Sequence, residues 1–123
     1  MLAEHGHDPE VVVWWATEVE CESGIARGER EGLLTGAEGT LARERLEELR
    51  ERWVEVEPAE PQRKAARRLL RTHPLRACDA LQLSAGLVAA EADPVTLELV
   101  TLDDRLAEAA RREGFQVVPQ QHV

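Results

Sequence analysis

The stretch VVVWWATEVE at residues 11–20 decides the fold expected of this chain. Residues 11–15 form an unbroken run of β-branched and aromatic residues, which predicts a strand buried on both faces. Thr17-Glu18-Val19-Glu20 follows and fits a capping box, in which Thr17 caps a helix and Glu20 reaches back from the third position. A helix that directly follows a doubly buried strand is typical of α/β proteins with a parallel sheet.

The alternation of strands and helices continues to the end of the chain. Helices are predicted at residues 17–31, 40–52, 60–72, 75–91 and 103–113. Further short strands are predicted at residues 54–57, 97–102 and 115–118. We therefore expect an α/β fold, with a short parallel sheet flanked by helices on both faces. In such sheets ligands bind beyond the carboxyl ends of the strands.

Length and composition indicate one globular domain. The chain has 123 residues, of which 43% are hydrophobic, and a chain of this size can bury a core without disulfides or metal. No apolar run approaches the roughly 20 residues of a membrane span, and no secretory signal opens the chain. The two cysteines, Cys21 and Cys78, are too few for a disulfide framework. We expect a cytoplasmic protein without membrane contact.

The net charge of −9 is unevenly distributed. Residues 1–60 carry 16 acids and 6 bases, whereas residues 61–123 carry 8 acids and 9 bases. Six bases and no acid lie between Arg63 and Arg76. Such a segment can contact nucleic-acid phosphates, with a merely solvated helix face as the alternative. The acidic total therefore does not exclude RNA or DNA as a partner.

Three carboxylates stand at the starts of predicted helices. Asp79 is the only charged residue of a long apolar stretch, Asp103 follows a predicted strand, and Glu20 lies in the first helical turn. Each also has a purely structural explanation. The helix dipole favours an acid in the first turn, where Asp79 lies. Asp103 or Asp104 could cap the following helix, and Glu20 could complete the capping box with Thr17. Together, at one edge of a parallel sheet, they predict a site for Mg²⁺ or Mn²⁺. Such an ion suits phosphodiester hydrolysis.

Four segments of the chain resemble PIN-domain proteins of the VapC ribonuclease toxin type. Residues 76–85, RACDALQLSA, match the pattern R-x-x-D-A-L-x-L-A-A, and residues 100–110, VTLDDRLAEAA, match V-T-x-D-x-x-L-x-x-A-A. Residues 114–118, GFQVV, match the closing G-x-x-V-V strand. Residues 17–27 are similar to the segment that carries the second acid of the family. The resemblance covers residues 11–118.

The resemblance implies a metal-dependent endoribonuclease of a toxin–antitoxin pair. Glu20, Asp79 and Asp103 match its catalytic, metal-binding acids, and Asp104 is a further candidate ligand for Mg²⁺ or Mn²⁺. RNA is the implied substrate, a cognate antitoxin the implied partner, and a homodimer the implied assembly. The basic segment would contact RNA through four arginines: Arg63, Arg67, Arg71 and Arg76.

The start of the chain departs from the family pattern. PIN domains open with a central strand of the type L-D-T-S, whose aspartate is the first metal ligand, and nothing similar precedes Val11. Residues 1–8, MLAEHGHD, resemble the tail of the helix that follows that strand. We therefore expect residues 1–123 to form a single PIN-like domain that is N-terminally incomplete and lacks its central strand.

Three functions are consistent with this sequence. The first is an active ribonuclease toxin, and the second is a catalytically impaired PIN-like module that binds an antitoxin or dimerises. The third is a small α/β protein with unrelated ligand chemistry.

Overall fold

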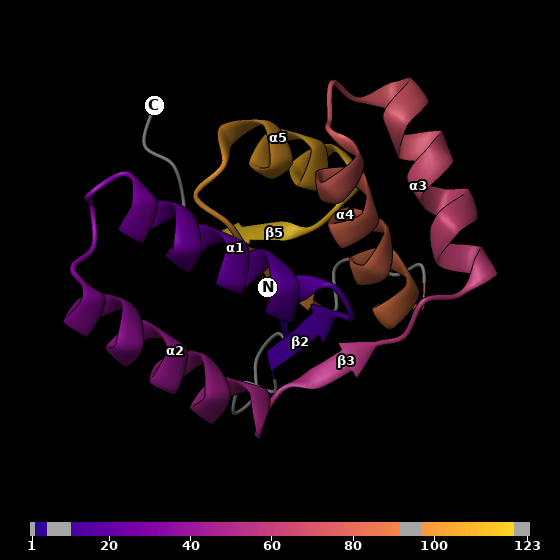
Figure 1. Cartoon of the computed structure of the whole chain (residues 1–123). Helices are drawn as coiled ribbons and strands as arrows, with labels where there is room; N and C mark the ends of the chain where they lie inside the picture. Colours follow the sequence, from indigo (N-terminus) through magenta and orange to yellow (C-terminus); the bar gives the residue numbers. More distant parts are fainter. Residues whose placement is uncertain (1, 5–10, 92–96, 120–123) are drawn as a thin grey trace.

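The chain folds as a mixed α/β domain around a five-stranded sheet of strand order β3-β2-β1-β4-β5, seen in Figure 1. The structure is a computed structural model and describes residues 2–4, 11–91 and 97–119. Its strands are β1 (Leu2–Glu4), β2 (Val11–Trp14), β3 (Val54–Val56), β4 (Leu97–Val100) and β5 (Gln116–Val118). Its helices are α1 (Thr17–Arg30), α2 (Gly36–Arg50), α3 (Glu60–Thr72), α4 (Ala77–Ala89) and α5 (Asp104–Arg112).

The expected α/β class is confirmed, and the predicted helices and strands occur in the predicted order. Gly32 and Gly114 follow α1 and α5 with backbone φ angles of 74° and 102°. These left-handed conformations favour glycine, and they explain why the two helices end where the sequence predicts.

The middle of the sheet is occupied by a strand that the sequence pattern does not predict, and this strand carries no L-D-T-S motif. Leu2–Glu4 forms β1 in the middle of the sheet, so the interpretation of this segment as the tail of a helix is wrong. β1 runs antiparallel to both neighbours, with Leu2 opposite Val12 on one side and Leu99 on the other. Six residues separate β1 from β2, whereas a parallel crossover needs a dozen or more. The short connection therefore requires an antiparallel pair, and the sheet is mixed instead of wholly parallel.

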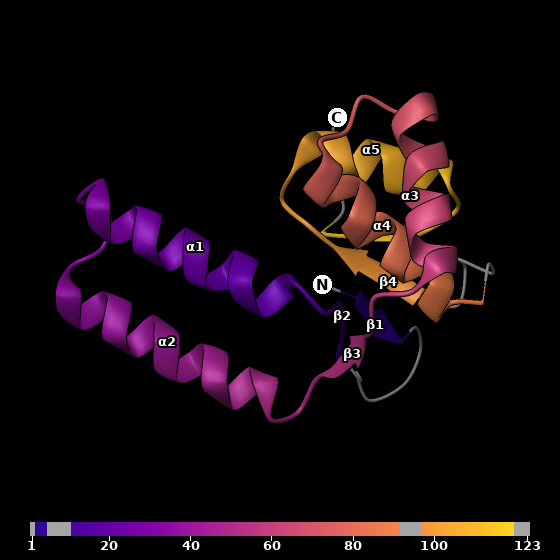
Figure 2. The same ribbon diagram turned by 45° about the vertical axis from the view of Figure 1, so that its right-hand side comes forward.

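The helices cover the two faces of the sheet unequally. Figure 2 shows α3, α4 and α5 gathered together, while α1 and α2 project away from them as a hairpin. Val12, Leu99 and Val117 belong to the main core with residues of these three helices. Val13 points to a smaller cluster with Leu46 and Trp53. Val100 of β4 and Val118 of β5 are exposed. Among the described residues, helices therefore cover both faces of the sheet at β2, as expected, but only one face at β4 and β5.

Ion pairs and a close helix approach hold the α1–α2 hairpin together. Arg43 of α2 contacts Glu22 at 2.8 Å and Glu29 at 2.7 Å, and Arg50 contacts Glu18 at 3.0 Å. A Cβ at the buried Gly39 would collide with the carboxylate of Glu29. Because these ion pairs are largely exposed, each contributes little to the free energy of folding. Their main effect is on how the two helices are oriented.

The second helix starts earlier than the sequence pattern predicts. α2 begins at Gly36, not Thr40, because Thr35 and Glu38 form a reciprocal capping box. The amide of Glu38 donates to Thr35 Oγ1 at 3.1 Å, and the amide of Thr35 donates to Glu38 Oε1 at 2.9 Å. These bonds satisfy two backbone N–H groups that the start of a helix leaves free.

Within the described ranges, no helix combines the length and the apolar character that crossing a membrane requires.

Truncation of the core is expected to destabilise the domain. Leu99 is 0% exposed in β4, beside the central strand. Leu99→Ala should lower the free energy of unfolding by about 2–5 kcal/mol, because it leaves a cavity that the sheet cannot close. Urea denaturation measures this loss. Leu102→Ala is the matched control: Leu102 is 87% exposed, so its truncation should change stability by less than about 0.5 kcal/mol. Equal losses in the two variants would contradict the packing described.

Candidate functional site

The candidate site lies where β2 leads into α1. β2 ends at Trp14, and α1 begins at Thr17 after a short turn, so Glu20 lies in the first turn of α1. The expected capping box is wrong, because Ala16 is the N-cap residue and no side chain caps α1. The hydroxyl of Thr17 is buried, and no hydrogen-bond partner for it is found in the described structure. Glu20 is therefore not engaged at the helix cap.

Glu20 lies in an electrostatically unfavourable position for a carboxylate. Burial raises its pKa, the neighbouring indole N–H of Trp14 partly offsets that effect, and the negative charge of Asp79 raises the pKa further. The Trp14 N–H is itself buried and forms no hydrogen bond within the described part of the chain. The carboxylate of Asp79, on α4, is thus close enough to disfavour the charged form of Glu20, on α1.

Asp79 lies in the first turn of α4, as the helix-dipole alternative predicts. Its side chain is only 13% exposed and lies 3.4 Å from Nε of Arg76. Hydrogen bonding and charge from Asp79 raise the pKa of Arg76, and the charge of Asp103 adds to the effect. Arg76 therefore links Asp79 electrostatically to the next acid of the predicted set.

Asp103 caps α5, which confirms the structural alternative for this residue. Its Oδ1 accepts a hydrogen bond from the amide of Leu106 at 2.9 Å. Asp104, the first residue of α5, is exposed. In the described ranges no three His, Cys, Asp or Glu side chains are grouped closely enough to hold a metal ion. Of the predicted acids, Asp79 thus acts electrostatically on Glu20, while Asp103 is engaged as the cap of α5.

The predicted basic residues lie on α3 and on the loop after it. Arg67 and Arg71 are exposed, opposite the buried Ala66 and Leu69, and form no ion pair with another described residue. Arg63 is exposed and lies 3.5 Å from Glu60. It lines a cavity of about 360 Å³ together with Trp14, Gln62 and Leu81. Because Trp14 ends β2, this cavity places the start of α3 beside the carboxyl edge of the sheet.

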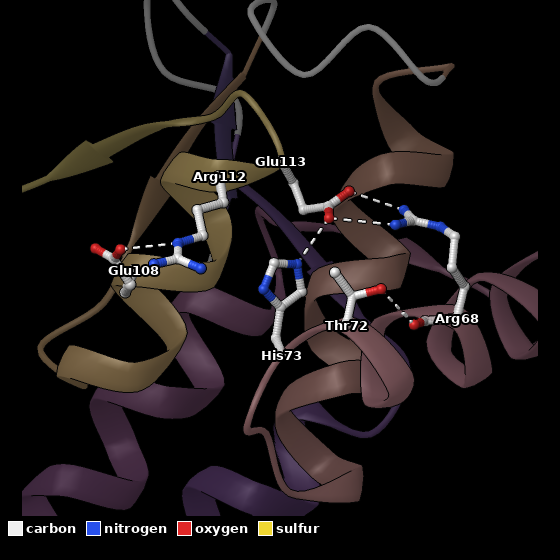
Figure 3. A network of polar contacts seen from close by, with 6 residues as sticks. All are labelled: Arg68, Thr72, His73, Glu108, Arg112 and Glu113. Carbon is white, nitrogen blue, oxygen red and sulfur yellow. Dashed lines mark hydrogen bonds and ion pairs between the residues drawn. The ribbon is translucent and has the colours of Figure 1, made fainter.

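A second polar network was not predicted from the sequence. His73 follows α3, and Figure 3 shows its ring bonded to Glu113, which Arg68 also contacts. The hydrogen bond from Arg68 is the main cause that lowers the pKa of Glu113, with that from His73 secondary. His73 precedes Pro74 and Glu113 precedes Gly114, 40 residues apart. Nothing in the sequence around either residue predicts that the two side chains interact.

No protein-family model matches the chain, and a search of curated proteins finds no relative.

The pKa of Glu20 leads to a testable pH dependence. A group whose pKa is raised in the folded state contributes stability that is fully present below its unfolded pKa and is lost as pH rises through the folded value. Glu20→Gln cannot ionise and escapes this loss. Its free energy of unfolding, relative to that of the wild type, should therefore increase between about pH 4 and about pH 7. Urea titrations at several pH values measure the difference.

Glu44→Gln provides the control for this titration, because Glu44 is exposed on α2. Its stability relative to the wild type should change little over the same pH range. If both variants showed the same pH dependence, the local electrostatics assigned to Glu20 would be incorrect.

Proposed function

We propose that this protein is a Mg²⁺-dependent endoribonuclease that resembles the VapC toxins of the PIN-domain class. The observation that carries the proposal is the approach of Glu20 and Asp79, two carboxylates from separate helices, at the edge where β2 ends. Acids that repel each other at the carboxyl edge of an α/β sheet are typical of sites that collect a hard cation.

These carboxylates suit a magnesium site that has few protein ligands. Mg²⁺ keeps several waters and is commonly held by one or two carboxylates together with substrate phosphates. Glu20 and Asp79 would hold Mg²⁺ or Mn²⁺, and the second oxygen of Asp103 and the carboxylate of Asp104 are further candidates from α5. When bound, such an ion supplies an activated water and offsets negative charge on the scissile phosphate.

The arginines supply the remaining functions of a ribonuclease site. Arg67 and Arg71 present exposed guanidinium groups on α3, and these groups are suited to bidentate contacts with RNA phosphates. Arg63 lies between this helix face and the cavity beside Trp14. Arg76 lies 3.4 Å from Asp79, and its guanidinium group is a further candidate contact for a phosphate near that carboxylate.

Cleavage of RNA should depend on both Mg²⁺ and Asp79. Loss of one carboxylate should remove several kcal/mol of transition-state stabilisation, so Asp79→Asn should cleave about 100-fold more slowly or worse. Initial rates on a labelled single-stranded RNA, with Mg²⁺ and with EDTA, measure the effect. Glu44→Gln serves as the matched control and should retain the wild-type rate. Activity that Asp79→Asn leaves intact would overturn the proposed site.

The second candidate is a catalytically impaired PIN-like module that acts through an antitoxin or a second copy of itself. The observation that favours it is the exposure of apolar side chains on the α1–α2 hairpin: Val19 and Leu41 on the two helices and Leu33 at the turn between them. An apolar surface on a projecting element marks a candidate protein interface.

Charges on the hairpin are expected to weaken such an interface. If the hairpin mediates dimerisation, Val19→Asp combined with Leu33→Asp should raise the dimer Kd by about tenfold or more, because charged groups would be buried in an apolar contact. Sedimentation velocity measures the oligomeric state, and circular dichroism verifies the fold. Leu102→Asp, at an even more exposed position outside the hairpin, should leave the oligomeric state unchanged. An unaltered mass distribution in the double variant would exclude the hairpin as the dimer contact.

A further inference from the structure

A cavity lies beyond the carboxyl ends of the parallel strands β2 and β3. Trp14, the last residue of β2, pairs with Val56, the last residue of β3. Trp14 lines a cavity of about 360 Å³ together with Pro58, Ala59, Glu60, Gln62, Arg63 and Leu81. Ligands of α/β sheets bind beyond such strand ends, and the volume is within the range of small-molecule sites.

Gln62 is a buried side chain whose hydrogen-bonding capacity is only partly used. It is 2% exposed, and its Nε2 donates to the backbone oxygen of Leu81 at 2.9 Å. Because a carbonyl oxygen only accepts hydrogen bonds, the NH₂ group must face Leu81, and this fixes the orientation of the carboxamide. Its oxygen and its second N–H form no hydrogen bond with another described residue. Buried polar groups are normally paired, so this carboxamide favours a ligand that supplies both a donor and an acceptor.

The rest of the lining favours a neutral, flat ligand. Trp14, Pro58 and Leu81 contribute aromatic and aliphatic surface. The two charged residues of the lining, Glu60 and Arg63, lie 3.5 Å apart, so their charges offset each other. An ion would gain little from this pair. An aromatic ring would gain from the apolar surface and from the guanidinium plane of Arg63.

Trp14 connects this cavity with the candidate acids. Its indole N–H lies next to Glu20, is buried, and forms no hydrogen bond within the described part of the chain. The same side chain lines the cavity. One indole ring thus contacts both the surroundings of Glu20 and the cavity, an arrangement that two adjacent nucleotides of one strand can span.

We propose that this cavity binds a base of the RNA strand next to the cleavage position, and that Gln62 recognises the edge of that base. Nucleobases present hydrogen-bond donors and acceptors side by side, and glutamine pairs with such an edge through both groups of its carboxamide. Unstacked RNA bases are commonly bound by hydrogen bonds to their edges and by contacts with aromatic rings or guanidinium planes. The assignment of RNA as the ligand rests on the proposed ribonuclease function.

Nucleosides test the cavity directly, because they carry a base but no phosphate. In proton–nitrogen correlation NMR spectra, the side-chain amide signals of Gln62 should shift on addition of adenosine, cytidine, guanosine or uridine. The side-chain amide signals of Gln116, which is exposed on β5, are the internal control and should stay in place. Gln62 signals that none of the nucleosides shifts would overturn the base site.

RNA binding in EDTA extends the test to the proposed substrate. Ala59→Phe adds a ring at an exposed residue of the lining. In fluorescence anisotropy it should bind a labelled single-stranded RNA about tenfold more weakly than the wild type, as for the loss of one base contact. The slope of log K against log salt should stay the same, because no phosphate contact is lost. Ala37→Phe, at an exposed position of α2, is the matched control and should change neither quantity. Equal binding by the two variants would overturn the base assignment.

The outcomes separate this inference from the proposed function. Neither measurement uses Mg²⁺, so loss of metal-dependent cleavage would refute the proposed function alone. Unshifted Gln62 signals in a protein that cleaves RNA would refute the base site alone. If nucleosides shift the Gln62 signals but the RNA does not, the cavity binds a free nucleoside and its assignment to the RNA strand is wrong.

Discussion

The position of β1 is the constraint on which the rest of the fold depends. β2 and β4 each expose a row of backbone N–H and C=O groups toward the middle of the sheet, and buried groups of this kind must be paired. Leu2–Glu4 pairs with both strands at once. Since β1 is antiparallel to each, β2 and β4 run in the same direction. Their parallel partners β3 and β5 then bring four carboxyl ends to one edge of the sheet.

The orientation of β1 determines which elements can supply acids to that edge. In the resembled family the central strand is of the type L-D-T-S and carries the first metal-binding aspartate. Here the amino end of β1 lies at the carboxyl edge of its neighbours, and Glu4 pairs with Leu97 at the opposite edge. The candidate carboxylates therefore come from the starts of helices instead: Glu20 from α1, Asp79 from α4, and Asp103 from the cap of α5.

Local patterns predict the elements of this protein, and non-local pairing decides their arrangement. The run at residues 11–15 correctly predicts a strand, and its successive residues Val12 and Val13 point to opposite faces and reach two different cores. The three residues of β1 are too few to show a period of their own, so only the unpaired edges of β2 and β4 reveal their role. Thr17 and Thr35 both precede a glutamate by three positions, yet only Thr35 forms the capping box. Thr17 is buried and lies inside α1 after the N-cap Ala16, whereas Thr35 is exposed and is itself the N-cap of α2, and no local pattern contains that difference.

The candidate site follows the same division between local and non-local information. The positions of Asp79 and Asp103 at helix starts are readable from sequence, whereas the interaction of Glu20 with Asp79 requires the fold. The net charge of the chain does not show which acids have a basic partner and which do not. Glu29 and Glu113 each have an arginine partner that lowers their pKa, from Arg43 and Arg68 respectively.

Glu20 shows the opposite behaviour, because burial and another acid raise its pKa. A carboxylate that is costly to ionise in the protein alone is stabilised by any cation that binds beside it. The raised pKa of Glu20 is therefore the feature of this edge of the sheet on which the proposed metal site most depends.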